Sequence, residues 1–276
     1  MLKRYTELLS RHSILGFFRI VLARLSPFEK WRYTRAVKSG RVYLGEHLSA
    51  RQGVTARHHY MAALVAKTEV AEPRLLEVGC WAGGSAVVFA RALKNHFGKG
   101  HLTCVDPWEV FYEQGTGNVG NINADHRKAM GSGKVFELFQ HNLRAAGIAD
   151  LVSAHRSKFG EWTTNQTFDL IYIDGDHRYD SVRQDLEKAH GLLKIGGFLC
   201  GDDLERQYHE VDPDFCEQHL TDDFVFEPKK ALAHFHPGVT KAVGEFFTDP
   251  VSAYEGFWVM QKAGENRYVS VQLDAR

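Results

Sequence analysis

The sequence has little of several features that would assign it to a class at once. Its four cysteines, Cys80, Cys104, Cys200 and Cys216, show no CxxC pair and no regular spacing, a pattern typical of reduced, buried thiols in a cytosolic protein. No apolar run approaches the roughly 18 residues of a membrane span. The N-terminus lacks the charged, apolar and small-residue regions of a secretory leader in their usual order. We therefore expect a cytoplasmic protein.

The net charge is zero, because 34 Lys and Arg balance 34 Asp and Glu. The molecule as a whole thus has no electrostatic case for binding nucleic acid. The charge is uneven, however: residues 1–41 hold ten basic residues against two glutamates, a net +8 that leaves −8 on the other 235 residues. Within them, residues 13–25 predict a basic amphipathic helix. Packing on its own domain or on a second subunit is favoured, and contact with a membrane surface is the alternative.

Two patterns follow one another along the chain. Residues 1–60 predict helices broken near Pro27, Gly40, Gly45 and Gly53. From residue 74, short apolar runs alternate with helical periods, as in a parallel sheet with crossover helices. Strands are expected at 74–79, 101–106, 151–155, 169–173, 198–200, 256–262 and 268–273, and helices at 85–97, at 135–147 and from a cap at Asp180 or Ser181.

These elements predict an N-terminal helical extension (residues 1–55) and a doubly wound α/β domain (residues 56–276). Residues 204–247 do not fit the alternation, and we expect an insertion that caps the substrate. In such sheets ligands bind beyond the carboxyl ends of the strands. Residues at those ends are therefore the candidates for function.

The first strand runs into Glu77-Val-Gly-Cys-Trp-Ala-Gly-Gly-Ser85. Its glycines let the backbone pass close to a ligand, and the following helix offers free N–H groups. Trp81 occupies the place of the second glycine in the dinucleotide fingerprint G-x-G-x-x-G, which argues against a pyrophosphate. The indole face suits a cationic ligand instead.

The second and third strands each end in one polar candidate. Asp106 can accept hydrogen bonds from both hydroxyls of a ribose, although an Asp before a proline is as often a turn residue. Ser157 stands where the edge of an adenine would lie.

Carboxylates gather after the fourth and fifth strands. Ile171-Tyr-Ile-Asp-Gly-Asp-His177 brings two carboxylates and a histidine to one strand end, and Gly201-Asp202-Asp203 ends its expected neighbour. Three carboxylates at one point repel unless a cation joins them or some are protonated. Oxygen ligands favour a hard ion such as Mg²⁺, so we predict a metal site at Asp174, Asp202 and Asp203. The alternative is that one or two of them cap helices or pair with Arg178 or Arg183.

On these residues the chain resembles class I S-adenosylmethionine-dependent methyltransferases. It is most similar to the branch of macrocin- and mycinamicin-type sugar O-methyltransferases and cephamycin-type enzymes, and more distantly to catechol O-methyltransferase. The resemblance covers roughly residues 55–203 and, loosely, the last strands. Its motifs are Glu77–Ser85, Asp106-Pro-Trp108, Asp174-Gly-Asp-His-Arg-Tyr-Asp-Ser-Val182 with Asp185, and Gly196-Gly-Phe-Leu-Cys-Gly-Asp-Asp203. It implies a mostly parallel, seven-stranded Rossmann-like sheet.

The resemblance also implies a role for each candidate. The residues bordering S-adenosylmethionine would be Glu77, Gly79, Trp81, Gly83, Ser85, Asp106 and Ser157. Asp174, Asp202 and Asp203 would hold Mg²⁺ or another hard divalent cation, which lowers the pKa of an acceptor hydroxyl. His177, three residues after Asp174, would act as general base with a pKa near 6.5; its alternative role is a helix cap. Asp176 receives no task.

Residues 108–133 and 204–247 lie beside the strand ends and carry aromatic and histidine side chains. A lid over an organic acceptor would use Trp108, Phe111, Tyr112, Tyr208, His209, Phe235 and His236. The alternative is that most of them form a small core of the insertion. His234-Phe-His236 suggests a second metal site, but alternate histidines are more often surface residues, and no role is assigned to the pair.

Three functions are compatible with the sequence. The favoured one is a metal-assisted O-methyltransferase acting on a small molecule, such as a sugar, a polyketide or a natural product with a diol. The second is a metal-independent N- or O-methyltransferase of the same fold. The third is a nicotinamide-dependent dehydrogenase or a cofactor-binding protein without catalysis, and Trp81 with the Asp202-Asp203 pair argues against the dehydrogenase. The basic N-terminal helices are compatible with a homo-oligomer.

Overall fold

The computed structural model describes residues 27–50, 55–110, 129, 131–226, 234–247 and 249–274. The predicted helix at 13–25 and the lid candidates Phe111 and Tyr112 lie outside these ranges. No helix of the described part is long and apolar enough to cross a membrane.

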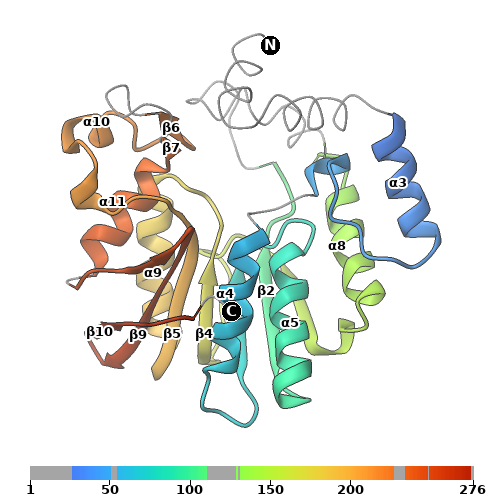
Figure 1. The fold of residues 1–276 in the computed structure, drawn as a ribbon, viewed down its shortest axis with the longest axis horizontal. Coiled ribbons are helices and arrows are strands. Elements are labelled where there is room, and N and C mark those ends of the chain that lie inside the picture. Colours follow the sequence, from blue (N-terminus) through green and yellow to red (C-terminus); the bar gives the residue numbers. More distant parts are fainter. Residues whose placement is uncertain are drawn as a thin grey trace.

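A mixed sheet forms the centre of the molecule (Figure 1). Its strands are β1 (Arg74–Val78), β2 (His101–Asp106), β3 (Val152–Arg156), β4 (Phe168–Ile173), β5 (Leu193–Leu204), β9 (Gly256–Gly264) and β10 (Arg267–Ser270), in the order β10-β9-β5-β4-β1-β2-β3. The first five run parallel, and β9 and β10 are antiparallel. A short strand, β8 (Ser252–Tyr254), also pairs with β9. The predicted doubly wound, mostly parallel sheet of seven strands is confirmed.

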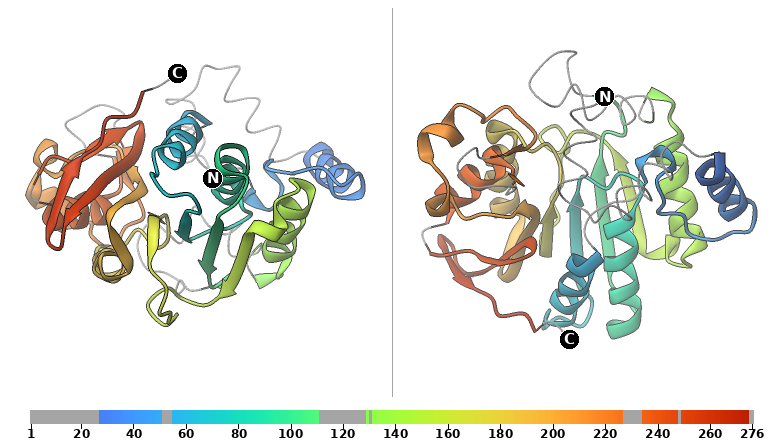
Figure 2. Two further views of the ribbon diagram at one scale, coloured as in Figure 1. Left: turned by 90° about the horizontal axis from the view of Figure 1, so that it is seen from below. Right: turned by 45° about the horizontal axis from the view of Figure 1, so that its top comes forward.

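Helices cover both faces of the sheet (Figure 2). Helices α4 (Thr55–Ala66), α5 (Gly84–Phe97) and α8 (Lys134–Ala145) share one core with alternate strand residues such as Leu75 and Leu170. Helices α9 (Tyr179–Leu192) and α11 (Pro237–Phe246) share the opposite core with the intervening residues, such as Leu76 and Ile171. This alternation follows from the period of two along a strand.

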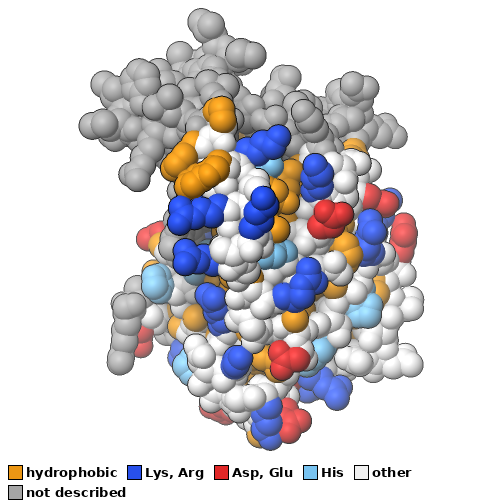
Figure 3. Space-filling model, turned by 90° about the vertical axis from the view of Figure 1, so that its right-hand side faces the viewer, with side chains coloured by type: hydrophobic (Ala, Val, Ile, Leu, Met, Phe, Trp, Pro, Cys, Tyr) orange, Lys and Arg blue, Asp and Glu red, His pale blue; other side chains and the backbone are white. Residues whose placement is uncertain are grey.

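The described part of the N-terminal extension consists of α3 (Pro27–Lys38) and the short helix η1 (His47–Ser49). The buried Asn142 of α8 fastens it: its side chain accepts from the Tyr43 amide at 2.8 Å and donates to the carbonyls of Tyr43 at 2.9 Å and Ala82 at 2.8 Å. On the side of the molecule that carries α3 and α8, basic side chains gather (Figure 3). Phe28 and Trp31 of α3 stack there and are exposed.

The predicted insertion divides into two parts. Its first part comprises η3 (Tyr208–Glu210), α10 (Pro213–Glu217), β6 (Val225–Phe226) and β7 (His234–Phe235), and it has a small core of its own that includes Phe235. The alternative considered for that residue is therefore correct. The second part, α11, packs against α9 and belongs to the main core.

The ends of β1 and β4 approach each other closely at Gly79. A methyl group added at Gly79 is therefore expected to destabilise the protein strongly. Gly79 has φ +81°, and a Cβ there would lie 1.9 Å from the Asp174 carbonyl oxygen, whereas Gly98, with φ +68°, has nothing within 4 Å. Gly98→Ala should cost about 1–2 kcal/mol for the left-handed backbone. Gly79→Ala should cost at least about 2 kcal/mol more because of the overlap. Equal losses in urea unfolding would contradict this reading.

Candidate active site

The loop between β1 and α5 is fastened by Asp106, the last residue of β2. One carboxylate oxygen of Asp106 accepts from the backbone N–H groups of Cys80 at 2.8 Å and Trp81 at 2.9 Å. The other accepts from the Trp108 N–H at 2.6 Å. These bonds hold Trp81 and Trp108 in left-handed conformations, with φ values of 44° and 45°. Such backbone conformations cluster at ligand sites, where the surrounding structure imposes them.

The same bonds limit what else Asp106 can bind. A carboxylate has about four acceptor positions, and three of them here take backbone donors. The side chain is also buried, which raises the pKa of Asp106 above its usual range against the effect of the backbone N–H groups. The structure thus places Asp106 at the predicted position, but mainly as the anchor of the loop.

Glu77 and Ser85 lie beneath the loop rather than on its surface. Glu77 is fully buried, and it accepts hydrogen bonds from the Ser85 hydroxyl and, at 3.4 Å, from the Cys104 thiol. Burial raises the pKa of Glu77 to about 8. The carboxyl is therefore protonated at neutral pH, and it supports the loop from below.

The burial of Glu77 predicts a pH dependence of stability. Because its folded-state pKa of about 8 exceeds the ordinary 4.5, the free energy of unfolding should fall as pH rises from 4.5 through 8. Glu77→Gln keeps the Ser85 contact without the ionisable proton, so its stability relative to wild type should improve by about 3 kcal/mol between pH 6 and pH 9. The exposed Glu72→Gln is the control and should keep the wild-type profile. Parallel thermal-unfolding profiles for all three proteins would contradict the buried-acid account.

The remaining loop candidates lie around this anchor. The half-buried Trp81 indole donates to the Ser49 carbonyl at 2.9 Å, and the Trp108 indole donates to the Trp81 carbonyl at 2.7 Å. Trp108 is buried against the core, so it is not the lid residue that we expected. Ser157 follows β3, and its amide donates to the Asp106 carbonyl at 3.2 Å.

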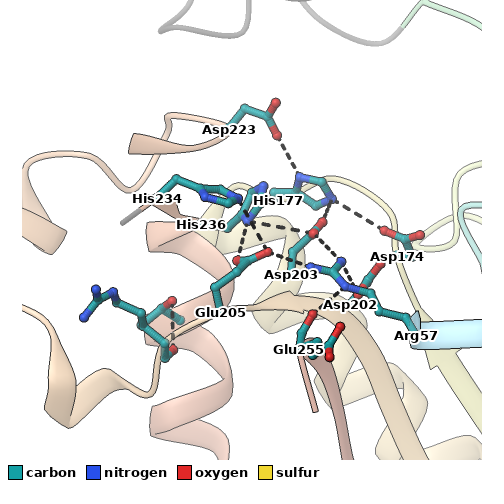
Figure 4. A network of polar contacts seen from close by, with 12 residues as sticks. Arg57, Asp174, His177, Asp202, Asp203, Glu205, Asp223, His234, His236 and Glu255 are labelled. Carbon is teal, nitrogen blue, oxygen red and sulfur yellow. Dashed lines mark hydrogen bonds and ion pairs between the residues drawn. The ribbon is translucent and has the colours of Figure 1, made fainter. Parts of the chain in front are cut away.

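A β-bulge aims the two carboxylates at the end of β5. Gly201 pairs with Trp258 and Leu204 with Gly256, so the strand carries one extra residue between these pairs. Asp203 adopts φ +67° there. A bulge of this kind bends the strand and redirects its side chains. As a result, Asp203 points toward His177, whereas Asp202 lies beside Arg57 (Figure 4).

Arg57 of α4 is the main partner of these carboxylates. It forms ion pairs with Asp202, with Asp203 at 3.1 Å and with Glu205 at 2.9 Å, and its Nε donates to the Glu255 carbonyl at 2.7 Å. Only 7% of its side chain is exposed. Nothing in the local sequence around Arg57 indicates this role, because its partners lie about 150 positions further along the chain.

Arg57 does not fully offset the negative charge of the carboxylates around it. Burial and the neighbouring charges of Asp203 and Asp174 raise the pKa of Asp202 to about 8, despite Arg57. One buried oxygen of Asp202 also lacks a hydrogen bond of good geometry, although the guanidinium lies against it as an ion pair. Burial therefore disfavours the charged form of Asp202, and Arg57 offsets this only in part.

His177 lies among carboxylates. Its Nε2 is 3.1 Å from Asp203 Oδ2 and 3.7 Å from Asp174 Oδ1, and its Nδ1 is 2.7 Å from Asp223 Oδ1. Burial opposes its protonation, but Asp203, Asp174 and Asp223 together raise the pKa of His177 well above 6.5. The expected pKa near 6.5 is thus wrong for the protein without bound ligands. His177 does not cap α9, whose N-cap residue is Arg178 and which begins at Tyr179, not after Asp180 or Ser181.

Besides Arg57, Glu205 and Asp223 of this cluster were not predicted from the sequence. His236 was expected only as a lid residue, and the pair of His234 and His236 received no role. All four lie in the insertion (Figure 4). His236 Nδ1 is 3.0 Å from Glu205 Oε2 and 3.9 Å from Asp203 Oδ1. The spacing of His234 and His236 was the one available signal.

The predicted metal ligands share one edge of the sheet, but their side chains diverge. Ile173 pairs with Gly201, which sets Asp174 beside Asp202. Asp202 turns to Arg57, Asp203 faces His177, and Asp174 accepts from the Tyr172 hydroxyl at 3.2 Å. Asp176 now has a role, since it binds Arg178 and Ser181 at the start of α9.

The family model that matches this chain covers the residues at this edge of the sheet. Residues 76–204 match the family model "Methyltransferase domain". This range runs from within β1 to the end of β5 and includes the loop Glu77–Ser85, Asp106, His177 and the carboxylates of Asp174, Asp202 and Asp203. No match was found among the curated proteins.

Several solved structures resemble the chain at low sequence identity. The cofactor-bound protein Rv0187 from MTB matches with a TM-score of 0.50 and 16% identity, over 90% of this chain and 96% of that one. The O-methyltransferase TomG from Streptomyces achromogenes, solved with S-adenosylmethionine, matches with a TM-score of 0.48 and 17% identity, over 81% and 92%. CalS11, a TDP-rhamnose 3'-O-methyltransferase of calicheamicin biosynthesis, gives 0.45 and 14%, over 86% and 95%. At such identities the likeness concerns the fold.

Proposed function

We propose that this chain, a methyltransferase of the class I, S-adenosylmethionine-dependent fold, transfers a methyl group from S-adenosylmethionine to a hydroxyl of a small organic acceptor. The observation that carries the proposal is the position of His177. Its ring lies among Asp174, Asp203 and Asp223, at the edge of the sheet that also holds the loop Glu77–Ser85. A proton acceptor beside a cofactor loop is what a hydroxyl nucleophile needs.

The cofactor would lie on the loop and at the N-terminus of α5. Gly79 and Gly83 bring the backbone close to the methionine part, and the π face of Trp81 suits the sulfonium charge. Asp106 and Ser157 would lie on the ribose and adenine side. Glu77 and Ser85 would support the loop from beneath, in keeping with their burial.

A hard divalent cation such as Mg²⁺ fits the acids at the end of β4 and β5. Asp174, Asp202 and Asp203 would hold it, because all three offer oxygen ligands. Asp202 would exchange Arg57 for the ion at its buried oxygen, and Asp203 would turn from His177. When bound, such an ion lowers the pKa of a coordinated hydroxyl.

His177 would take the proton of the acceptor at Nε2. The acceptor oxygen then forms a bond to the methyl carbon while the carbon–sulfur bond breaks, and S-adenosylhomocysteine leaves with the electron pair on sulfur. Alignment of the two reactants by the loop and the insertion supplies much of the rate. Asp223, bound to Nδ1, fixes the tautomer that leaves Nε2 available.

The second candidate is a metal-independent methyltransferase of the same fold, acting on nitrogen or oxygen. Arg57 favours it, because its guanidinium already provides a positive charge among Asp202, Asp203 and Glu205. In that case the arginine replaces the ion, and His177 alone removes the proton.

Metal removal separates the two candidates. We would measure S-adenosylhomocysteine release with a panel of sugar, polyketide and diol acceptors, before and after EDTA and again after Mg²⁺ is restored. The metal-assisted mechanism predicts at least about a 100-fold loss in EDTA, recovery with Mg²⁺, and a similar loss in Asp202→Asn. Asp180→Asn, an exposed carboxylate on α9, is the matched control. Full activity in EDTA together with a near wild-type Asp202→Asn would support the second candidate and rule out the first.

A further inference from the structure

The geometry points to a separate transition-metal site formed by His177, Asp203 and His236. One ring nitrogen of each histidine and one oxygen of Asp203 all lie within 4.8 Å of one another. Figure 4 shows the three side chains converging from β5, the start of α9 and the segment after β7. We propose that this set binds Zn²⁺ or a similar transition ion. It differs from the three-carboxylate site in its ligands, although Asp203 belongs to both.

Both histidines have a carboxylate partner besides Asp203, but only for His177 does that partner lie on the ring nitrogen that faces away from Asp203; His236 uses Nδ1 for both carboxylates. His177 Nδ1 is 2.7 Å from Asp223, and His236 Nδ1 is 3.0 Å from Glu205. In metal sites a histidine ligand almost always shares its second ring nitrogen with such a partner, which fixes the tautomer and the ring orientation. For His177 this leaves Nε2, which lies 3.1 Å from Asp203 Oδ2.

The third ligand is held from two sides. The bulge at the end of β5 places Asp203 in a left-handed conformation, and Arg57 lies 3.1 Å from its Oδ1. The Asp203 side chain is therefore held toward the histidines in the protein without a bound ion. The exposed fractions of the three side chains are 22% for His177, 16% for Asp203 and 10% for His236, so an ion can reach them from solvent.

The ligand types decide the class of ion. Two imidazoles with one carboxylate suit Zn²⁺, Fe²⁺ or Co²⁺, whereas Mg²⁺ prefers oxygen ligands. With metal–ligand distances of about 2.0–2.2 Å and tetrahedral angles, ligand atoms lie about 3.3–3.6 Å apart. A set within 4.8 Å thus needs only small side-chain movements. Three protein ligands also leave coordination positions open to water or to another molecule.

Among the described residues a second set of ligand types, Glu77, Cys80 and Cys104, is fully buried in the core. It has no comparable access, and it carries no proposal. His234 also stays outside the proposed site. It does not belong to the set of ligand atoms within 4.8 Å, and its Nε2 lies 4.0 Å from Glu205 Oε1.

Binding at the proposed site does not depend on methyl transfer. If both proposals hold, the ion would occupy the ring nitrogen of His177 that takes the acceptor proton. Transition ions would then inhibit the reaction that Mg²⁺ supports. This relation rests on the proposed function, whereas the binding itself does not.

Cobalt is a suitable probe because its visible absorption becomes stronger and shifts when aqueous Co²⁺ enters a site with fewer ligands. The full chain would be titrated with Co²⁺ in excess Mg²⁺, by absorption and by calorimetry. We expect one equivalent to bind with d–d bands, and His236→Ala and His177→Ala to lower the affinity by at least about 10-fold. His234→Ala is the matched control and should remain within about 2-fold of wild type.

Wild-type affinity of His236→Ala for Co²⁺, or binding that His234→Ala weakens equally, would overturn the site. Calorimetry with S-adenosylhomocysteine shows that each variant is folded, and the conservative His236→Gln provides a second test. A chain that binds Co²⁺ as expected but does not bind S-adenosylhomocysteine would refute the proposed function alone. The opposite result would refute the metal site alone.

Discussion

Replacement of His177 by alanine is expected to lower the rate of methyl transfer by about 100- to 10,000-fold, the range found for removal of a general base. The affinity for S-adenosylhomocysteine should remain near that of wild type, because His177 lies beyond the loop Glu77–Ser85. The measurement is S-adenosylhomocysteine release under saturating cofactor. His219→Ala is the matched control, since His219 also pairs with an aspartate, Asp222, at 2.6 Å but lies outside the cluster.

The pH profile sharpens this prediction. A base must be neutral to accept a proton, and the carboxylates raise the pKa of His177 well above 6.5. Where no cation offsets these carboxylates, the rate should therefore still rise with pH above 6.5 and level off only beyond the raised pKa. Asp223→Asn removes one of the charges that raise it, so its profile should move to lower pH. Equal losses in His177→Ala and His219→Ala would contradict the base role, and a profile of the metal-free reaction that already levels off at pH 6.5 would contradict the raised pKa.

Replacement of Arg57 by methionine is expected to destabilise the protein by about 3–5 kcal/mol at pH 8, because it leaves buried acids without their partner. Asp202, Asp203 and Glu205 would then repel one another, and the loss should be smaller at pH 6, where the carboxyl of Asp202, with a pKa of about 8, is protonated. Urea unfolding measures both values.

Lys99→Met is the control for Arg57, because Lys99 pairs with Glu72 on the surface at 2.7 Å. Exposed pairs contribute roughly 0–1 kcal/mol. A loss for Arg57→Met no greater than that for Lys99→Met would show that the guanidinium does not hold the carboxylates together.

The strands, and the neighbourhood of the fourth and fifth, could be predicted because the evidence for the strands lies in the local sequence pattern. The short, mostly apolar runs Leu75–Val78 and Leu170–Ile173 mark strands buried on both faces, and alternation with helical periods implies a parallel sheet. The ends of these strands then coincide at one edge, and this places the loop after β1, Asp106, Asp174 and Asp202 together without further information.

The surroundings of the site could not be predicted, because they depend on contacts between distant parts of the chain. Arg57 reaches Asp202 from a helix that precedes the sheet, and Asp223 and His236 reach His177 from the insertion. The bulge that redirects Asp203 is a property of the pairing with β9. Without these partners, neither the raised pKa of His177 nor the ion pairs of Asp202 could be inferred.

For two residues, tertiary contacts changed the role that the local sequence had predicted. Trp108 follows a strand end as a lid residue would, but it packs against Phe136 and Phe139 in the core. Asp106 stands at the end of β2, as predicted, yet most of its acceptor capacity is taken by backbone N–H groups of the loop Glu77–Ser85 and of Trp108. Both residues shape that loop, and any contact with a ligand would come in addition.

The most direct test of the account is a calorimetric titration of the full chain with S-adenosylhomocysteine and, separately, with NAD. The loop Glu77–Ser85, with Trp81 in place of a second glycine, predicts binding of S-adenosylhomocysteine at one site per chain and no binding of NAD. Gly79→Ala should weaken that binding, and Gly98→Ala should not. Binding of NAD, or no binding of S-adenosylhomocysteine by the folded protein, would contradict the central claim.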